Sequence, residues 1–345
     1  MPIKYYDLGG LKKLHEIVMV GTHDAAITRG HGNVQTQTLN ILQQATAGVR
    51  FFDLRIAAAK VAGAPGQPKG AELQAYHGSL STKTKTRAVT IGGVTQNRQV
   101  ERSTMKYEGW GLSLNSILQD ARAFVGLNPT EFLLLKFDKC KNWELIAEAC
   151  VASLGDTLYS AGGHLNTKDL NDLQGKVVVL FSHDGLAEIA PAQMNARLAL
   201  LANPGGAAAA NMDSITCWQN LQKETTPAYN PGVPGLQYYG GFGESMMSPT
   251  TNKKISKNVT KQVNNMTSAR LQDRRVMRMM YWTTTGILQN IRDRNREMWQ
   301  PPNLRRFLAA WDSGLSATVS AHAPLYGPML PGAATQIRDY FPILS

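Results

Sequence analysis

The sequence predicts an α/β protein whose parallel strands form a barrel with helices on the outside. Short apolar runs alternate with segments of helical length and helical apolar spacing, most clearly between residues 113 and 181. Such alternation is typical of parallel sheets, because the chain needs a helical crossover to return to the next parallel strand. Four or five of these units precede Asp184, which favours a barrel over an open sheet. No repeat or composition break divides residues 1–345, so we expect a single domain.

The strands and helices follow from the apolar spacing in chain order. A short run that is apolar throughout predicts a buried strand, whereas apolar residues three and four apart predict a surface helix. Ser113 is a good N-cap for the clearest helix, and Asn128 and Pro129 end it. The predicted strands are 17–20, 49–56, 72–76, 132–135, 177–181, 276–282 and 317–323, and the predicted helices are 35–47, 113–127, 143–154 and 304–311.

The remaining segments carry weaker signals. Residues 57–70 are rich in Ala, Gly and Pro and predict a loop. Residues 79–111 form a long, basic, Thr-rich insertion that suits a hairpin or a mobile flap better than a core element. Between about 186 and 275 the pattern is irregular, and no element can be assigned there.

The composition describes a water-soluble protein with a sizeable core and a basic surface. Hydrophobic residues make up 43% of the chain, and 36 Lys and Arg outnumber 25 Asp and Glu, a formal charge of +11. This balance favours an anionic partner, either an acidic membrane surface or a nucleic acid, although a basic surface without a partner is equally compatible with it. Cys140, Cys150 and Cys217 lack the spacing of a zinc site or a disulfide framework, so we expect reduced thiols.

Targeting signals are absent from the sequence pattern. No apolar run approaches the length of about 18 residues that a spanning helix needs, and residues 1–7 lack the apolar core of a secretory signal. The compartment therefore stays open between the cytoplasm and export by a non-classical route.

Ionisable side chains stand where three predicted strands end. His23 and Asp24 follow the first strand, Asp53 and Arg55 lie at the end of the second, and His77 follows the third. Side chains alternate along a strand, so Asp53 and Arg55 point to the same face. If these strands are neighbours, their ends meet at one mouth and the five side chains converge there.

Two imidazoles, a carboxylate and a guanidinium can break a phosphodiester by acid–base catalysis. One imidazole takes a proton from a hydroxyl, the second gives a proton to the leaving oxygen, and an adjacent carboxylate fixes the tautomer. Arg55 can hold the phosphate through paired hydrogen bonds. The alternatives are that each histidine only satisfies a loop carbonyl, and that Asp53 and Arg55 form a buried ion pair that sets strand register.

A metal site is the competing interpretation. Asp24, Asp53 and Asp138 could supply oxygen ligands for calcium or magnesium. Arg55 disfavours this, because a guanidinium beside Asp53 already provides the positive charge that a metal would bring. We therefore predict no metal and no other cofactor. Further candidates for anion binding are Lys136, Lys139 and Arg50, although a lysine at a strand end is more often simply solvated.

The order of these blocks resembles the X-region of bacterial phosphatidylinositol-specific phospholipase C. The blocks are 21–24 (Gly-Thr-His-Asp), 48–55 (Gly-Val-Arg-Phe-Phe-Asp-Leu-Arg), 76–78 (Tyr-His-Gly) and, before a Leu-rich strand, 128–131 (Asn-Pro-Thr-Glu). Their joint occurrence between about residues 16 and 181 is far more specific than any one of them. The resemblance implies a distorted TIM-type (β/α)8 barrel that cleaves phosphoinositide to diacylglycerol and a cyclic inositol phosphate.

The resemblance also implies a role for each of the five residues. His23 is expected to be the general base, and His77 the general acid, supported by Asp24. Arg55 is expected to stabilise the phosphate where the animal enzymes of the family use calcium. Asp53 is expected to belong to the same hydrogen-bonded floor.

Substrate-binding positions are matched less securely. The family's inositol-holding tyrosine corresponds to Tyr238 or Tyr239, and Lys136 and Lys139 are the candidate cations beside it. The family's late aspartate, which partners the base histidine, corresponds to Asp312 or Asp339. Ser182 and His183 stand where the family has an arginine, which leaves the head-group specificity open.

The partner implied by this resemblance is a phosphoinositide in an anionic membrane surface. We expect a monomer with peripheral membrane contact and no nucleic-acid partner, and Trp110 or Trp299 could enter the headgroup layer. The insertion at 79–111 departs from the family, and we expect it to be a lid or a surface-binding flap. Two other functions stay open, namely a metal-dependent glycerophosphodiesterase or sphingomyelinase-D-like enzyme, and a lipid-binding barrel without turnover.

Overall fold

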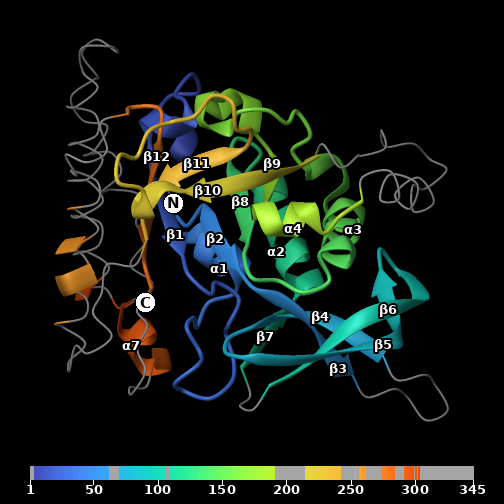
Figure 1. The fold of residues 1–345 in the computed structure, drawn as a ribbon. Coiled ribbons are helices and arrows are strands. Elements are labelled where there is room, and N and C mark those ends of the chain that lie inside the picture. Colours follow the sequence, from blue (N-terminus) through green and yellow to red (C-terminus); the bar gives the residue numbers. More distant parts are fainter. Residues whose placement is uncertain are drawn as a thin grey trace.

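Seven parallel strands close into a barrel in the described part of the chain, and helices lie against its outside (Figure 1). The structure, a computed structural model, describes residues 4–61, 70–105, 109–190, 214–241, 273–283 and 291–298, with a few positions between 253 and 303. The barrel strands are β1 (Val18–Thr22), β2 (Phe51–Leu54), β8 (Phe132–Phe137), β9 (Lys176–Phe181), β10 (Ile215–Asn220), β11 (Leu236–Tyr239) and β12 (Met277–Tyr281).

The predicted α/β barrel of distorted TIM type is confirmed, with seven strands rather than eight among the described residues. The strands follow one another round the ring in chain order, and β12 closes it onto β1. Strand β8 is buried along its whole length, as parallel strands under helices require. Gly21 lets β1 approach both neighbours, because a Cβ there would lie 2.9 Å from Met279 Sδ and 3.1 Å from Phe51 O.

The helices largely match the predicted ones. In α2 (Leu114–Leu127), Ser113 Oγ accepts a hydrogen bond from the Ser116 amide at 3.1 Å, as expected for an N-cap. The predicted helix 35–47 is shorter in the structure, because Asn40 Oδ1 caps α1 (Ile41–Thr46) by accepting from the Gln43 amide at 2.8 Å. The other helices are α3 (Trp143–Leu154), α4 (His183–Ala187) and α7 (Ile291–Met298), and the 3-10 turns are η1 (Tyr5–Leu8), η2 (Leu14–Glu16), η3 (Gly155–Thr157), η4 (Leu165–Thr167), η5 (Leu170–Leu173) and η7 (Leu221–Lys223).

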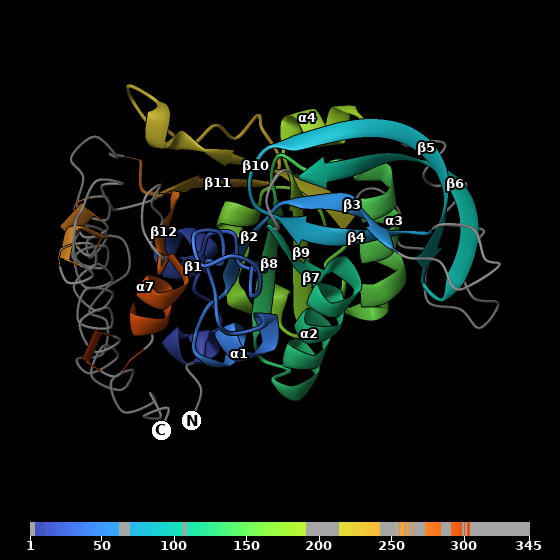
Figure 2. The same ribbon diagram turned by 90° about the horizontal axis from the view of Figure 1, so that it is seen from below.

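A second, five-stranded sheet is inserted between β2 and β8, and it flanks the barrel (Figure 2). Its longest element is a hairpin whose register runs from Leu80↔Met105 to Ile91↔Val94. Gly92 (φ +57°) and Gly93 (φ +82°) form the turn, which needs positive φ at both positions. The strands of this sheet are β3 (Ile56–Val61), β4 (Gly70–Tyr76), β5 (Leu80–Ile91), β6 (Val94–Met105) and β7 (Trp110–Ser113).

The second sheet corrects two predictions and decides a third. The segment predicted as a loop at 57–70 begins as strand, since β3 runs to Val61, and β4 starts at its last residue, Gly70. The predicted third strand is β4, which pairs antiparallel with β3 and lies outside the barrel. The insertion at 79–111 is an antiparallel hairpin followed by β7, as one of the two expectations had it, and its role as a lid or flap stays a prediction.

Two barrel strands escaped the sequence analysis. Strands β10 and β11 lie inside 186–275, where no element could be assigned. The predicted helix 304–311 and strand 317–323 lie outside the described residues, as do Asp312, Asp339 and Trp299. No helix in the described part of the chain has the length and apolar character that a bilayer crossing requires.

Candidate active site

The carboxyl ends of the barrel strands bring the predicted residues together. His23 and Asp24 directly follow β1, Asp53 lies in β2, Arg55 separates β2 from β3, and Lys136 lies in β8. Strands β1 and β2 pair through Gly21↔Phe51 and Thr22↔Phe52, and β2 pairs with β8 through Asp53↔Lys136. Consecutive parallel strands therefore deliver these side chains to one mouth of the barrel.

His23 is buried, and both ring nitrogens face charged groups. Nδ1 contacts Asp53 Oδ2 in a short hydrogen bond. Nε2 lies 3.2 Å from Asp24 Oδ2 and 3.4 Å from Arg55 Nη2. The backbone amide of His23 donates to Thr283 Oγ1 at 3.1 Å, and the edge of the ring faces Tyr281 at 6.0 Å between centroids. The imidazole is thus fixed in position and orientation.

The carboxylates around His23 raise its pKa. Burial disfavours the charged imidazole, but the charges of Asp24 and Asp53 and their hydrogen bonds outweigh that effect, so the pKa of His23 rises to about 8. Neutral His23 with its proton on Nδ1 donates to Asp53, and its unprotonated Nε2 faces Arg55 Nη2 at 3.4 Å. The site therefore holds an imidazole of raised basicity whose tautomer is set by Asp53.

Asp24 connects the two histidines. Its Oδ2 lies 2.5 Å from His77 Nδ1 and 3.2 Å from His23 Nε2. Its Oδ1 lies 3.3 Å from Arg55 Nε, which is ion-pair distance without hydrogen-bond geometry. Although Asp24 is fully buried, the cationic neighbours hold the pKa of its carboxyl well below the usual value. Its backbone adopts φ +44°, a left-handed conformation that aspartate tolerates better than most residues.

His77 reaches the barrel mouth from the second sheet. It follows β4, and its backbone amide donates to Gly109 O at 2.8 Å. The neighbouring Tyr76 amide donates to Arg55 O at 2.9 Å, which anchors the end of β4 to the connection after β2. The His77 side chain is 28% exposed, so a ligand in the mouth can reach its ring. The two imidazoles consequently depend on two different sheets.

Lys136 provides the positive charge beside Asp53. Its Nζ lies 3.0 Å from Asp53 Oδ1 and 3.7 Å from Asp138 Oδ2, and it sits 4.0 Å from the centre of the Trp218 ring. Burial opposes the charged ammonium, but the Asp53 charge outweighs it and the pKa of Lys136 is raised. The same pairing lowers the pKa of Asp53 against its burial. Asp53 is therefore a carboxylate held between His23 and Lys136.

The remaining predicted residues separate into those near the site and those away from it. Tyr238 is buried beside Phe51, with ring centroids 5.1 Å apart, and the Lys136 charge acts on its hydroxyl. Tyr239, one residue later, faces outward into a separate cluster. Lys139 has an exposed side chain, and its backbone oxygen accepts a hydrogen bond from Tyr76 Oη at 2.5 Å.

Arg50, a candidate for anion binding, is a structural residue instead. It is fully buried and donates to Glu131 Oε2 from Nε at 2.9 Å and from Nη2 at 2.7 Å. Its guanidinium also lies over the rings of Tyr5 and Phe124. Both of its charged contacts lie within the fold, so it cannot reach a ligand in the barrel mouth.

Three residues of the site were missed by sequence reasoning. Trp218 lies in β10, in a segment where no strand could be assigned, so nothing marked it. Tyr281 and Thr283 stand at the end of the predicted strand 276–282, and the rule that placed His23 at a strand end would have singled them out. Thr283 also accepts a hydrogen bond from Gln37 Nε2 at 3.0 Å, which joins the loop after β1 to the end of β12.

The donor set does not match a metal site in the described residues. No group of three His, Cys, Asp or Glu side chains there is arranged to hold a metal ion. The three proposed ligands already face cations, namely Arg55 for Asp24 and Lys136 for both Asp53 and Asp138. A divalent ion would have to displace these cations to reach the carboxylates.

The chain is similar to known proteins in its fold alone. No protein-family model and no curated protein matches the sequence. The fold is similar to the phosphatidylinositol-specific phospholipase C of Listeria monocytogenes, at 14% identity and a TM-score of 0.43, covering 90% of this chain and 95% of that one. It is also similar to a phosphatidylinositol-specific phospholipase C of S. aureus, at 14% identity and a TM-score of 0.41, covering 85% and 95%.

Proposed function

We propose that the chain is a phosphodiesterase of the phospholipase C type, in which His23 and His77 share the proton transfers. The observation that carries this proposal is that one carboxylate, Asp24, lies 2.5 Å from His77 Nδ1 and 3.2 Å from His23 Nε2. Arg55 Nη2 lies 3.4 Å from the same His23 nitrogen. Two candidate proton-transfer groups and one candidate anion-binding group are therefore joined through one carboxylate.

The substrate is proposed to be a phosphoinositide that is cleaved on its glycerol side. Neutral His23 accepts at Nε2 the proton of the inositol 2-hydroxyl, whose oxygen then bonds to phosphorus. The bond from phosphorus to the glycerol oxygen breaks, and protonated His77 gives its Nε2 proton to that oxygen. The products are diacylglycerol and a cyclic inositol phosphate, and all atoms and protons are accounted for.

The surrounding charges support each step. Asp53 stabilises the imidazolium that forms at His23, and Lys136 keeps Asp53 ionised by its contact at 3.0 Å. Asp24 orients His77 so that Nε2 faces the leaving group. Arg55 offsets the charge that grows on the phosphate oxygens, for which a guanidinium is well suited because of its planar fork of donors.

The test is to incubate the purified protein with vesicles of phosphatidylinositol, with and without a chelator, and to identify the phosphorylated product by phosphorus NMR. A cyclic phosphate that forms equally with chelator supports the proposal. Loss of turnover with chelator would instead favour a metal-dependent phosphodiesterase. Variants His23→Asn and His77→Asn should each reduce turnover by about 10²-fold or more, the usual contribution of a proton-transfer group. His164→Asn is the matched control, because His164 lies beside the amino end of β11, away from the mouth.

A further inference from the structure

One face of the β5–β6 hairpin carries every cation of the hairpin. Residues directly opposite in an antiparallel pair share a face, and so do residues two apart along a strand. The register pairs Lys83 with Arg102 and Arg87 with Arg98, and Lys85 lies between them. The basic face is therefore defined by these five side chains. The opposite face is built from Thr82, Thr84, Thr86, Thr90, Thr95 and similar polar residues, with Glu101 as its one charge.

Without a partner, the cations of the basic face destabilise the hairpin. Like charges directly opposite each other destabilise a strand pair, and Lys83↔Arg102 and Arg87↔Arg98 are two such pairs. Arg98 has a compensating partner, since its guanidinium binds both oxygens of Glu148 at 2.8 and 2.9 Å. Lys83, Lys85, Arg87 and Arg102 make no ion pair within the described part of the chain. Nε of Arg87 and of Arg102 also lacks a hydrogen-bond partner there.

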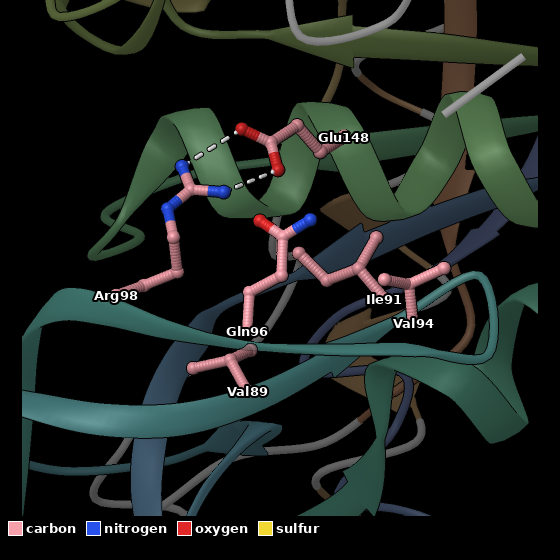
Figure 3. Close-up of a pocket in the computed structure, with 6 residues that line it drawn as sticks. All are labelled: Val89, Ile91, Val94, Gln96, Arg98 and Glu148. Carbon is pink, nitrogen blue, oxygen red and sulfur yellow. Dashed lines mark hydrogen bonds and ion pairs between the residues drawn. The ribbon is translucent and has the colours of Figure 1, made fainter. Parts of the chain in front are cut away.

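The hairpin holds this face in a fixed position. Towards the tip the basic face itself packs on α3, because Val89 and Ile91 lie on this face and are buried there, and Glu148 on α3 receives Arg98 (Figure 3). The exposed cations, Lys83 and Lys85, lie nearer the base of the hairpin. Nearer the base, the Asn142 side chain accepts from the Glu101 amide at 2.7 Å and donates to the Glu101 carbonyl at 3.1 Å. Lys85 and Arg87 lie between these two anchors, and Lys83 and Arg102 lie one position beyond the second one, so the cations sit on an anchored element.

The basic face starts beside the candidate active site. Strand β5 begins at Leu80, three residues after His77, and Arg102 of β6 pairs with Ala58, three residues after Arg55. Figure 2 shows the hairpin running from this end of the second sheet out across α3. A surface bound to the hairpin is therefore held next to the barrel mouth.

We infer that the basic face of the hairpin, through its exposed Lys83 and Lys85 and its half-exposed Arg87 and Arg102, docks on an anionic phospholipid surface. The inference rests on the proposed function, because it supplies the way in which a lipid-cleaving site is brought to its substrate. Charge complementarity selects the occupant, and basic residues near an acidic bilayer each contribute by attraction alone, without a shaped pocket. Residues 79–105 contain no aromatic side chain, so the hairpin lacks the stacking platform that single-stranded nucleic acids require.

The test compares Lys83→Gln/Lys85→Gln with Lys4→Gln/Arg122→Gln, a control with the same change in net charge at exposed positions outside the hairpin. Binding is measured by sedimentation with phosphatidylcholine vesicles that contain phosphatidylserine and no inositol lipid. The hairpin variant should bind about 25-fold more weakly, at about fivefold per charge, and the control should bind like the wild type. Wild-type binding should also fall steeply as salt is added.

Equal vesicle binding by the hairpin variant and the wild type would overturn the inference, and so would an equal loss in the control. Increased self-association of the hairpin variant with unchanged vesicle binding would show that the lysines only protect a sheet edge. Tighter binding to DNA than to vesicles would point to nucleic acid instead. Failure of the proposed function is seen separately: a wild type that binds vesicles through Lys83 and Lys85 but cleaves no inositol lipid retains the docking surface and loses the enzyme.

Discussion

At the residue scale, the site is organised by two carboxylates that each contact more than one basic side chain. Asp24 faces His77 and His23, and Asp53 faces His23 and Lys136. A carboxylate shared in this way holds two groups in a fixed relation and sets the charge of both. Substitution of either aspartate is therefore expected to change protonation equilibria as well as positions.

The first prediction concerns the pH profile. In the proposed mechanism His23 must be neutral and His77 protonated, so kcat/KM of the wild type should give a bell-shaped pH profile whose rising limb follows the His23 pKa of about 8. Asp53→Asn removes one of the two charges that raise this pKa, so the rising limb should move to lower pH by about one unit or more. The maximum of kcat/KM should fall by about 10²-fold or more, because the amide no longer fixes the tautomer. The measurement is kcat/KM against pH between 5 and 10.

Asp138→Asn is the control for this experiment. Asp138 approaches Lys136 at 3.7 Å and does not contact His23. Its substitution should therefore not change the pH at which kcat/KM rises. A limb that stays in place in Asp53→Asn would contradict the role given to Asp53.

The second prediction uses the same pKa as a statement about stability. The folded-state pKa of His23 is raised from 6.5 to about 8. The protonated form thus stabilises the fold fully below pH 6.5, and this contribution is lost as the pH rises through about 8. The free energy of unfolding of the wild type should fall by about 2 kcal/mol from pH 6 to pH 9.

Urea unfolding at pH 6 and pH 9 measures this change. His23→Gln should show a smaller difference between the two pH values, because the titrating group is missing. An identical difference in the variant would mean that other groups cause the loss.

At the element scale, the hairpin depends on a buried ion pair at its tip. Glu148 is 1% exposed, and its oxygens are satisfied by Arg98 at 2.8 and 2.9 Å. Removing Arg98 takes away the opposite charge that binds a buried carboxylate, which costs far more than removing one member of an exposed pair. The chain offers both kinds, since Lys141 approaches Glu101 at 3.8 Å on the surface.

The third prediction is that Arg98→Met destabilises the protein by about 3 kcal/mol or more, whereas Lys141→Met costs less than about 1 kcal/mol. Arg98→Met combined with Glu148→Leu should recover much of the loss, because no charge is then left buried. Chemical denaturation of the four proteins measures these differences. Equal destabilisation by the single and the double substitution would show that the lost packing of the long side chains dominates.

Among the elements, the sequence predicted the strands and helices that have a simple apolar pattern and missed the strands that lack one. Strand β8 is apolar throughout and was recognised, whereas β10 and β11 mix polar and aromatic residues and were not. Strand β3 continues through three alanines, which read as a loop because alanine has little strand preference. Its strand state comes from pairing with β4, a contact that no local pattern announces.

The same distinction explains the site. His23, Asp24, Asp53, Arg55 and His77 were found because each stands at the end of an apolar run. Tyr238 and Tyr239 could not be separated, since successive side chains point to opposite faces and the register of β11 was unknown. The shared use of Asp24 depends on a tertiary contact between the end of β4 and the barrel, so spacing could not reveal it.

At the scale of the whole molecule, the candidate site is built from two sheets, the barrel and the second sheet, and the strands of the barrel are the more deeply buried. The barrel strands β8 and β9 are almost completely buried, whereas most of β5 is exposed on the surface of the second sheet. Exposed strands with few buried apolar side chains open at lower free energy than core strands. His23 follows a strand of the barrel, and His77 follows a strand of the second sheet.

The fourth prediction is that activity is lost before the barrel unfolds. Urea should loosen the second sheet first, which removes His77 from Asp24 while His23 and Asp53 keep their places. Trp143 packs against Phe181 between α3 and β9, at 4.9 Å between ring centroids, so its environment reports on the barrel. Turnover should therefore fall at a lower urea concentration than the far-ultraviolet circular dichroism and tryptophan fluorescence, and amides of β5 and β6 should exchange faster than those of β8 and β9. If all of these transitions coincide, the two sheets unfold as one unit, and His77 does not separate from His23 before the barrel unfolds.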